Sequence, residues 1–84
     1  MKWLLCWSAE ASNDLDRLDP EVADRVMHAL DRLALEGWGD VRRLAGIDPP
    51  EYRLRVGKLR IRFQIDHAAE TLYVLHVLRR DEAY

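Results

Sequence analysis

The stretch from Arg53 to Ile65 alternates between apolar and polar side chains almost without a break. A period of two residues is typical of a β-strand with one buried face. The alternation resets at residues 56–59, which predicts a tight hairpin turn in which Gly57 takes the unusual backbone angles. We therefore expect two antiparallel strands with one apolar face. That face would carry Leu54, Val56, Leu59, Ile61, Phe63 and Ile65.

The opposite face of this hairpin is expected to be basic and directed outward. It would carry Gln64 and a row of four arginines, Arg53, Arg55, Arg60 and Arg62. A turn at residues 66–71 then leads into another strand, TLYVLHVLRR, which is apolar at both parities, as strands inside a sheet usually are. In that strand His76 would share parity with Val74, Leu78 and Arg80 and would line the arginine side. A half-buried histidine with a purely structural role fits the same pattern.

The N-terminal half predicts one strand followed by two helices. Residues 2–7 are rich in Trp and Leu and predict a buried strand, because so few residues do not make a free-standing helix. Ser8 is a good N-cap for a helix over residues 9–18. A second helix, with proline at its first position, is expected from Pro20 to Glu36, and Gly37 would end it.

Together these elements predict an α+β fold in two layers. Both helices carry an apolar stripe at helical spacing, and the short joint between them predicts a helical hairpin packed on the sheet. Residues 41–44 predict a short edge strand, so the expected order is β-α-α followed by three or four strands. We expect one domain over residues 1–84. Its helices would cover one face of a curled, mainly antiparallel sheet and leave the other for function or a partner.

The net charge of −2 conceals a division of the chain. Residues 1–51 contain six Lys and Arg against eleven Asp and Glu, whereas residues 52–80 contain seven against two. A basic sheet beside an acidic helical half predicts a localised anion-binding face. A sheet face that is charged only for solubility fits the same counts.

Other features of the sequence exclude several classes of function. Cys6 is the only cysteine, so neither an internal disulfide nor a cysteine zinc site can form. His28, His67 and His76 lack metal-ligand spacing, and the sequence has no phosphate loop, dinucleotide fingerprint or nucleophile elbow. No apolar run approaches the roughly 20 residues that span a bilayer. We expect a cytoplasmic protein that needs no metal or cofactor and does not bind a membrane.

Four segments, taken in order, resemble one known family. They are WSAEASNDLDRLDPEVADRV, then VRRLAG, then YRLRVGKLRIRFQID, and finally VLHVLRRDEAY. Together they resemble the RelE/ParE superfamily of toxins from type II toxin–antitoxin systems. The resemblance covers essentially the whole chain and implies the β-α-α-β fold expected above. It also implies a cognate antitoxin that wraps the chain in a hetero-oligomer.

The superfamily has two main branches with different activities. RelE-like members are metal-independent endoribonucleases that cleave mRNA on the ribosome and so inhibit translation, whereas ParE-like members inhibit DNA gyrase and have no known nuclease chemistry. Arginine forks bind phosphate and stabilise the charge that develops during RNA cleavage. We therefore favour the RNA-binding endoribonuclease, an mRNA interferase. Gyrase inhibition and a non-catalytic binding module remain as alternatives.

The resemblance also implies the roles of individual residues. Arg60 would clamp the scissile phosphate, Arg80 would assist the leaving group, and Tyr84 would orient or stack on a base. Arg53 and Arg55 would complete the catalytic set. The wider nucleic-acid-binding surface would consist of Arg53, Arg55, Lys58, Arg62 and Arg79.

The general base is less well defined by the resemblance. Nuclease members often have lysine or a carboxylate where a base is required, but this chain has arginine at both 53 and 55. Arginine stays protonated and is a poor base. His76, Tyr84 or a carboxylate could serve instead, or the base could be absent, which keeps gyrase inhibition open.

The antitoxin is expected to use the groove between the helical hairpin and the sheet edge, together with the arginine face. An acidic, amphipathic segment would place apolar residues against the helices and carboxylates near Arg53, Arg60 and Arg80. Substrate phosphate would then be excluded from its own charge sites.

Overall fold

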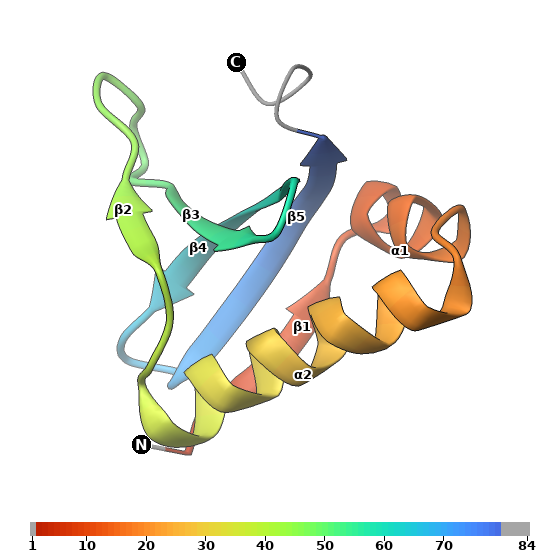
Figure 1. Cartoon of the computed structure of the whole chain (residues 1–84). Helices are drawn as coiled ribbons and strands as arrows, with labels where there is room; N and C mark the ends of the chain where they lie inside the picture. Colours follow the sequence, from red (N-terminus) through yellow and green to blue (C-terminus); the bar gives the residue numbers. More distant parts are fainter. Residues whose placement is uncertain (1, 80–84) are drawn as a thin grey trace.

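The structure, a computed structural model, describes residues 2–79 of the chain. Strands and helices follow one another in the order β-α-α-β-β-β-β (Figure 1). The elements of this part of the chain are β1 (Leu4–Trp7), α1 (Ala9–Asp16), α2 (Pro20–Glu36), β2 (Val41–Arg43), β3 (Tyr52–Val56), β4 (Leu59–Asp66) and β5 (Thr71–Arg79).

The strands form one sheet in the order β1-β5-β4-β3-β2. The edge strand β1 pairs in parallel with β5, and every other neighbouring pair is antiparallel. This topology confirms the expected α+β class and the mainly antiparallel sheet. It also places the first strand of the chain beside the last, with both helices between them in sequence.

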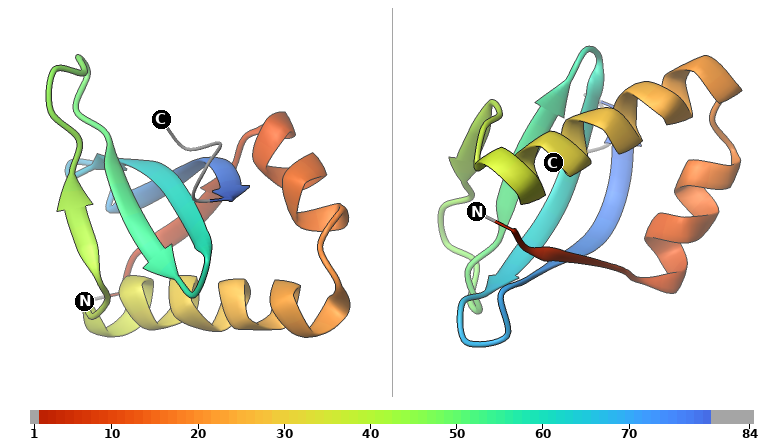
Figure 2. Two further views of the ribbon diagram at one scale, coloured as in Figure 1. Left: turned by 45° about the horizontal axis from the view of Figure 1, so that its top comes forward. Right: turned by 90° about the horizontal axis from the view of Figure 1, so that it is seen from below.

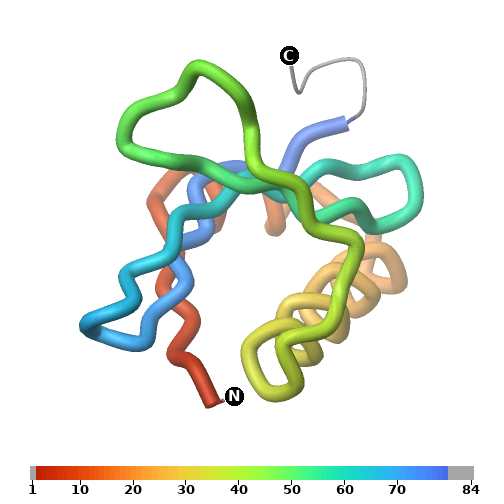
Figure 3. The backbone as a smooth tube through the Cα atoms, turned by 90° about the vertical axis from the view of Figure 1, so that its left-hand side faces the viewer, coloured from red at the N-terminus to blue at the C-terminus, as the bar shows by residue number. Residues whose placement is uncertain are grey.

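Helix α2 lies across one face of the sheet, while the connection between β2 and β3 extends away from that helix (Figures 1 and 3). Helix α1 crosses α2 steeply and packs beside β5 (Figure 2). The core between the layers is apolar. Its largest fully buried side chains are Val26 and Leu30 of α2 and Leu54, Ile61, Phe63 and Val74 of the sheet.

The helix ends follow local capping chemistry. The Ala11 N–H donates to Ser8 Oγ at 3.0 Å, which makes Ser8 the N-cap of α1. This helix ends at Asp16, two residues before the predicted end, and the Leu18 N–H instead donates to the Leu15 carbonyl at 3.1 Å. The predicted bounds of α2 are confirmed, and Gly37 ends it in the left-handed conformation with φ 70°.

The predicted hairpin between β3 and β4 is also confirmed. Val56 lies opposite Leu59, and Gly57 has φ 58°, a conformation that costs a residue with a side chain about 1–2 kcal/mol. The predicted strand at residues 41–44 is present as β2. The expected turn between β4 and β5 is present as well, at residues 67–70.

The pairing of β4 with β5 contains a bulge that the sequence pattern did not predict. Phe63 lies opposite Val74 and Arg62 lies opposite His76, so Leu75 is an extra residue without a partner on β4. The expectation that Val74 shares a face with His76 is therefore wrong: Val74 is fully buried in the core. His76 keeps its expected place beside the arginines because the bulge shifts the parity of the strand.

Within residues 2–79, neither helix is both long and apolar enough to cross a membrane.

Candidate functional site

The face of the sheet opposite α2 carries the four arginines of the hairpin, and we call it the arginine face. Direct cross-strand partners point to the same side of a sheet, so the register orders these side chains into rows. One row runs across four strands through Arg42, Arg53, Arg62 and His76. The next row runs through Arg55, Arg60 and Leu78.

In the first row, carboxylates from other parts of the chain pair with three of the four side chains. Arg53 Nη1 lies 3.5 Å from Asp40 Oδ1 and donates to the Asp40 carbonyl at 3.3 Å. Arg62 Nη2 lies 2.7 Å from Glu51 Oε1, in a pair that is largely shielded from solvent.

The third carboxylate of this row comes from α1. Asp14 Oδ2 lies 3.7 Å from His76 Nδ1, an ion-pair distance when the imidazole is protonated. Neither Asp14, Asp40 nor Glu51 belongs to the strands that carry the arginines. Most of this row is therefore balanced electrostatically.

The positive charge of the second row is not balanced in this way. Among residues 2–79, no carboxylate lies within ion-pair distance of Arg55 or Arg60. Arg55 is exposed, whereas Arg60 is buried and donates from Nη1 to the Leu59 carbonyl at 3.3 Å. Two like charges directly opposite one another destabilise a sheet. This pair is thus an energetic cost that the described part of the fold does not offset.

The expectation that all four arginines point outward into solvent is wrong for two of them. Arg53 is only 9% exposed and Arg60 only 7% exposed. Both lie on strands with neighbours on either side, and each residue as a whole is largely shielded from solvent. The exposed members, Arg42 and Arg55, lie on the edge strand and next to the hairpin turn.

A small polar pocket of about 220 Å³ opens at one end of the first row. Glu10 of α1 and Glu51, which precedes β3, face it together with Arg62 and His76. The buried Nε of Arg62 has no hydrogen-bond partner. The full lining is Ser8, Glu10, Glu51, Arg62, Leu75 and His76.

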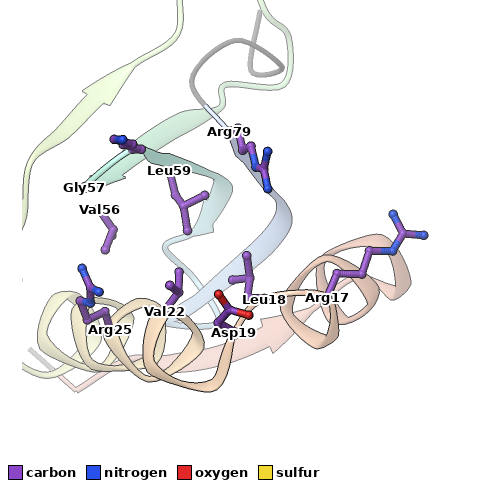
Figure 4. A pocket seen from close by; sticks show the side chains of 10 residues that line it. Arg17, Leu18, Asp19, Val22, Arg25, Val56, Gly57, Leu59 and Arg79 are labelled. Carbon is purple, nitrogen blue, oxygen red and sulfur yellow. The ribbon is translucent and has the colours of Figure 1, made fainter.

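A larger groove of about 1110 Å³ lies between the helical hairpin and the β3–β4 turn (Figure 4). Its apolar side chains, Leu18, Val22, Val56 and Leu59, come from both layers, and Asp19 is the acidic residue of its lining. Four basic residues surround them: Arg17, Arg25, Lys58 and Arg79.

The groove separates two of the expected nucleic-acid-binding residues from the others. Arg79 lies opposite Leu59, so its side chain leaves the sheet on the core side rather than on the arginine face. Lys58 in the hairpin turn lines the groove as well. The structure therefore brings together Arg53, Arg55, Arg60, Arg62 and His76. It does not bring Arg79 to them.

Two residues of the expected catalytic set, Arg80 and Tyr84, lie outside the described residues. In the part of the chain that is described, no group of three or more His, Cys, Asp and Glu side chains could hold a metal ion. The carboxylates Asp14, Asp40 and Glu51 were not predicted from the sequence. Glu51 and Arg62 are eleven positions apart in the sequence, and no local pattern links them.

Residues 5–84 match the family model described as ParE toxin of type II toxin–antitoxin system, parDE. A search of the curated proteins found no significant match.

The fold is similar to that of solved toxin structures. One is the archaeal RelE–RelB complex from Pyrococcus horikoshii OT3, with TM-score 0.81 and 22% identity over 99% of this chain and 100% of that chain. Another is the toxin–antitoxin complex RelBE2 from Mycobacterium tuberculosis, with TM-score 0.73 and 24% identity over 95% of this chain and 100% of that chain. A third is the RelB–RelE antitoxin–toxin complex from Methanococcus jannaschii, with TM-score 0.75 and 20% identity over 94% of each chain. At these identities the similarity shows a common fold.

Proposed function

Because the chain belongs to the ParE toxin family of type II toxin–antitoxin systems, we propose that it is a toxin that cleaves mRNA on the ribosome and acts in the cytoplasm. The single observation that carries the choice of activity is the pair formed by Arg55 and Arg60. These arginines face one another without a carboxylate partner among residues 2–79. A fold that places carboxylates on the neighbouring row but leaves this row cationic has the charge needed to hold a phosphate.

The chemistry of RNA cleavage fits this pair. Attack of the 2′-oxygen on the adjacent phosphorus forms a phosphorane with extra negative charge on its oxygens. Two guanidinium groups that point to the same side can donate several hydrogen bonds to those oxygens. Exposed Arg55 would meet the phosphate first, and buried Arg60 would stabilise the charge that develops. Costly local arrangements of this kind are expected at functional sites.

The first row has a different role in this proposal. Arg53 forms an ion pair with Asp40, and Arg62 forms one with Glu51. These pairs hold the segments on either side of β2 against the sheet. A substrate phosphate would have to displace a carboxylate to bind either of them. Arg42 lies at the exposed edge of the same row, where it can contact the RNA backbone farther from the cleaved bond.

Mapping RNA ends at codon resolution after a brief pulse of expression tests the activity. Cleavage at fixed codon positions in translated messages, lost in Arg60→Met, would support the ribonuclease. Arg25→Met, which removes an arginine from the groove rather than from the arginine face, is the matched control and should cleave normally in the absence of antitoxin. Intact mRNA during growth arrest would contradict the proposal.

Inhibition of DNA gyrase is the second candidate, and the match to the ParE family model favours it. The two activities give opposite results in one experiment, because gyrase inhibition would induce the DNA-damage response while mRNA stays intact. Purified gyrase with supercoiled plasmid provides the direct assay.

We also propose that an antitoxin segment occupies the groove. Four basic residues around an apolar floor suit an amphipathic segment with acidic residues on one side. The three solved complexes with similar folds each contain an antitoxin. Occupation of the groove would cover the apolar side chains of Leu18, Val22 and Val56, which would stabilise the toxin through binding.

A further inference from the structure

The bulge at Leu75 and the strand after it are held by Ser8, which connects β1 to α1, and by Asp14 of α1. Ser8 Oγ donates to the Leu75 carbonyl at 2.7 Å, and the Ser8 N–H donates to the Val74 carbonyl at 2.9 Å. Asp14 Oδ2 accepts from the Val77 N–H at 3.0 Å. The extra residue Leu75 has no partner on β4, and the Ser8 hydroxyl satisfies its carbonyl.

The same contacts determine where the imidazole of His76 lies. His76 follows the bulge residue, precedes the residue whose N–H is bound by Asp14, and faces Arg62 across the strands. The Asp14 carboxylate is thus fixed by a backbone donor while it approaches Nδ1 of the ring at 3.7 Å. A carboxylate on the Nδ1 side favours a hydrogen on that nitrogen, which leaves the Nε2 lone pair available.

We propose that His76 transfers the proton during RNA cleavage and that Asp14 is the residue that positions it. This inference rests on the proposed ribonuclease function and adds the proton-transfer group that the arginines cannot supply. The imidazole lies on the arginine face, on β5 opposite Arg62, so it is one same-face position from the row of Arg60 and roughly 7 Å from that row along the strand direction. A phosphate held by Arg55 and Arg60 would have its ribose within reach of this ring.

The reaction balances with these groups. The 2′-oxygen forms a bond to phosphorus, the bond from phosphorus to the 5′-oxygen breaks, and the products are a 2′,3′-cyclic phosphate and a 5′-hydroxyl. Nε2 of His76 accepts the proton from the 2′-hydroxyl, and the imidazolium is stabilised by Asp14. The 5′-oxygen takes its proton from water.

Other charged groups also lie near the imidazole of His76. Glu10 of α1 and Glu51 line the same small pocket, and Arg62 faces the ring from β4. Glu51 is already paired with Arg62. Asp14 is the carboxylate that approaches the imidazole, at 3.7 Å, and it also accepts a backbone hydrogen bond from Val77, so it is the positioning residue that the structure singles out.

Single-turnover cleavage of mRNA on programmed ribosomes tests the role of His76. His76→Gln should lower the rate by about 10²–10⁴-fold, the usual contribution of general acid–base catalysis, and should remove the decrease in rate that imidazole protonation causes at acid pH. The exposed His28 offers the matched control His28→Gln, which should cleave at the wild-type rate. A His76→Gln protein with the wild-type rate and pH profile would overturn the proposal.

The role of Asp14 has a readout that does not depend on cleavage. In ¹⁵N NMR spectra the neutral His76 ring should carry its hydrogen mainly on Nδ1, and Asp14→Asn should shift the population toward the Nε2–H tautomer while lowering the cleavage rate. Asp16→Asn, on the same helix but exposed, should change neither. A ring that carries its hydrogen on Nε2 in the wild type would overturn the positioning role.

The outcomes also distinguish failure of the proton-transfer role from failure of the proposed ribonuclease function. Cleavage by the wild type that survives His76→Gln removes only the proton-transfer role. A wild type that never cleaves RNA on the ribosome removes the ribonuclease function and this role together. An unfolding midpoint within a few degrees of the wild-type value shows that a lost activity is not lost folding.

Discussion

Arg55 and Arg60 lie directly opposite one another on β3 and β4, whereas Arg53 and Arg62, the next pair on the same face, are each bound by a carboxylate. The hairpin therefore presents two arginine pairs with different electrostatic surroundings. Only the first has no carboxylate partner among residues 2–79. Changes to the pair without a carboxylate should therefore lower activity, whereas changes to the carboxylate-bound pair should lower stability.

Replacing Arg60 with methionine should abolish toxicity without unfolding the protein. Methionine fills a similar volume and relieves the repulsion with Arg55, while loss of a donor to the developing charge typically lowers the rate by ~10²–10³-fold. Arg60→Lys should restore little activity because an ammonium does not reproduce the guanidinium fork. Growth arrest and thermal unfolding measure the two effects. Full toxicity in a folded Arg60→Met protein would exclude Arg60 from the site.

Replacing Glu51 with glutamine should destabilise the protein, because it leaves Arg62 without its counter-charge in a largely shielded site. We expect a loss of about 1–3 kcal/mol in the free energy of unfolding, the usual effect of removing a charged hydrogen-bond partner. The exposed pair of Arg32 and Glu36 provides the control, and Glu36→Gln should cost no more than about 0.5 kcal/mol. Urea denaturation measures both. Equal losses for the two variants would show that the pair of Arg62 and Glu51 contributes no more than a surface pair.

Replacing Ser8 with alanine should lower the free energy of unfolding by more than is usual for a serine near the surface. Its hydroxyl accepts from the Ala11 N–H as a helix cap and donates to the Leu75 carbonyl at the bulge. Loss of a cap alone costs about 1 kcal/mol, and we expect roughly 2 kcal/mol here. Asp19 precedes α2 but makes no side-chain capping bond, so Asp19→Ala is the comparison and should cost less. Urea denaturation measures both variants, and a loss of only about 1 kcal/mol for Ser8→Ala, the cost of the cap alone, would show that the contact to the bulge contributes nothing.

Reversing charge around the groove should weaken the antitoxin complex. Arg25→Glu with Lys58→Glu would place acidic groups where an acidic partner segment is expected to bind, so the dissociation constant should rise and its salt dependence should shrink. Arg43 is exposed and does not line the groove, so Arg43→Glu is the control. Titration calorimetry with the antitoxin at low and high salt provides the measurement. An unchanged dissociation constant would place the antitoxin elsewhere.

Local sequence chemistry was sufficient to predict most of the fold. The alternation around Gly57 predicted the β3–β4 hairpin and the position of its turn, and the capping residues Ser8 and Gly37 marked ends of the helices. These features depend on backbone preferences and on side chains only a few residues apart, so they can be read from a short window of sequence. The presence of His76 on the arginine face was also predicted, although the reason given for its parity was incomplete.

The sequence by itself determined which residues can form a basic face, and the tertiary structure decided which of them remain without a counter-charge. Asp40, Glu51 and Asp14 reach Arg53, Arg62 and His76 through the packing of three separate segments, and the bulge at Leu75 moves Val74 into the core while keeping His76 outside it. Burial of Arg60 likewise arises from neighbours on adjacent strands. Such effects require distant segments to meet, because a charge is neutralised or buried by what lies beside it in space, and periodicity along the chain does not contain that information.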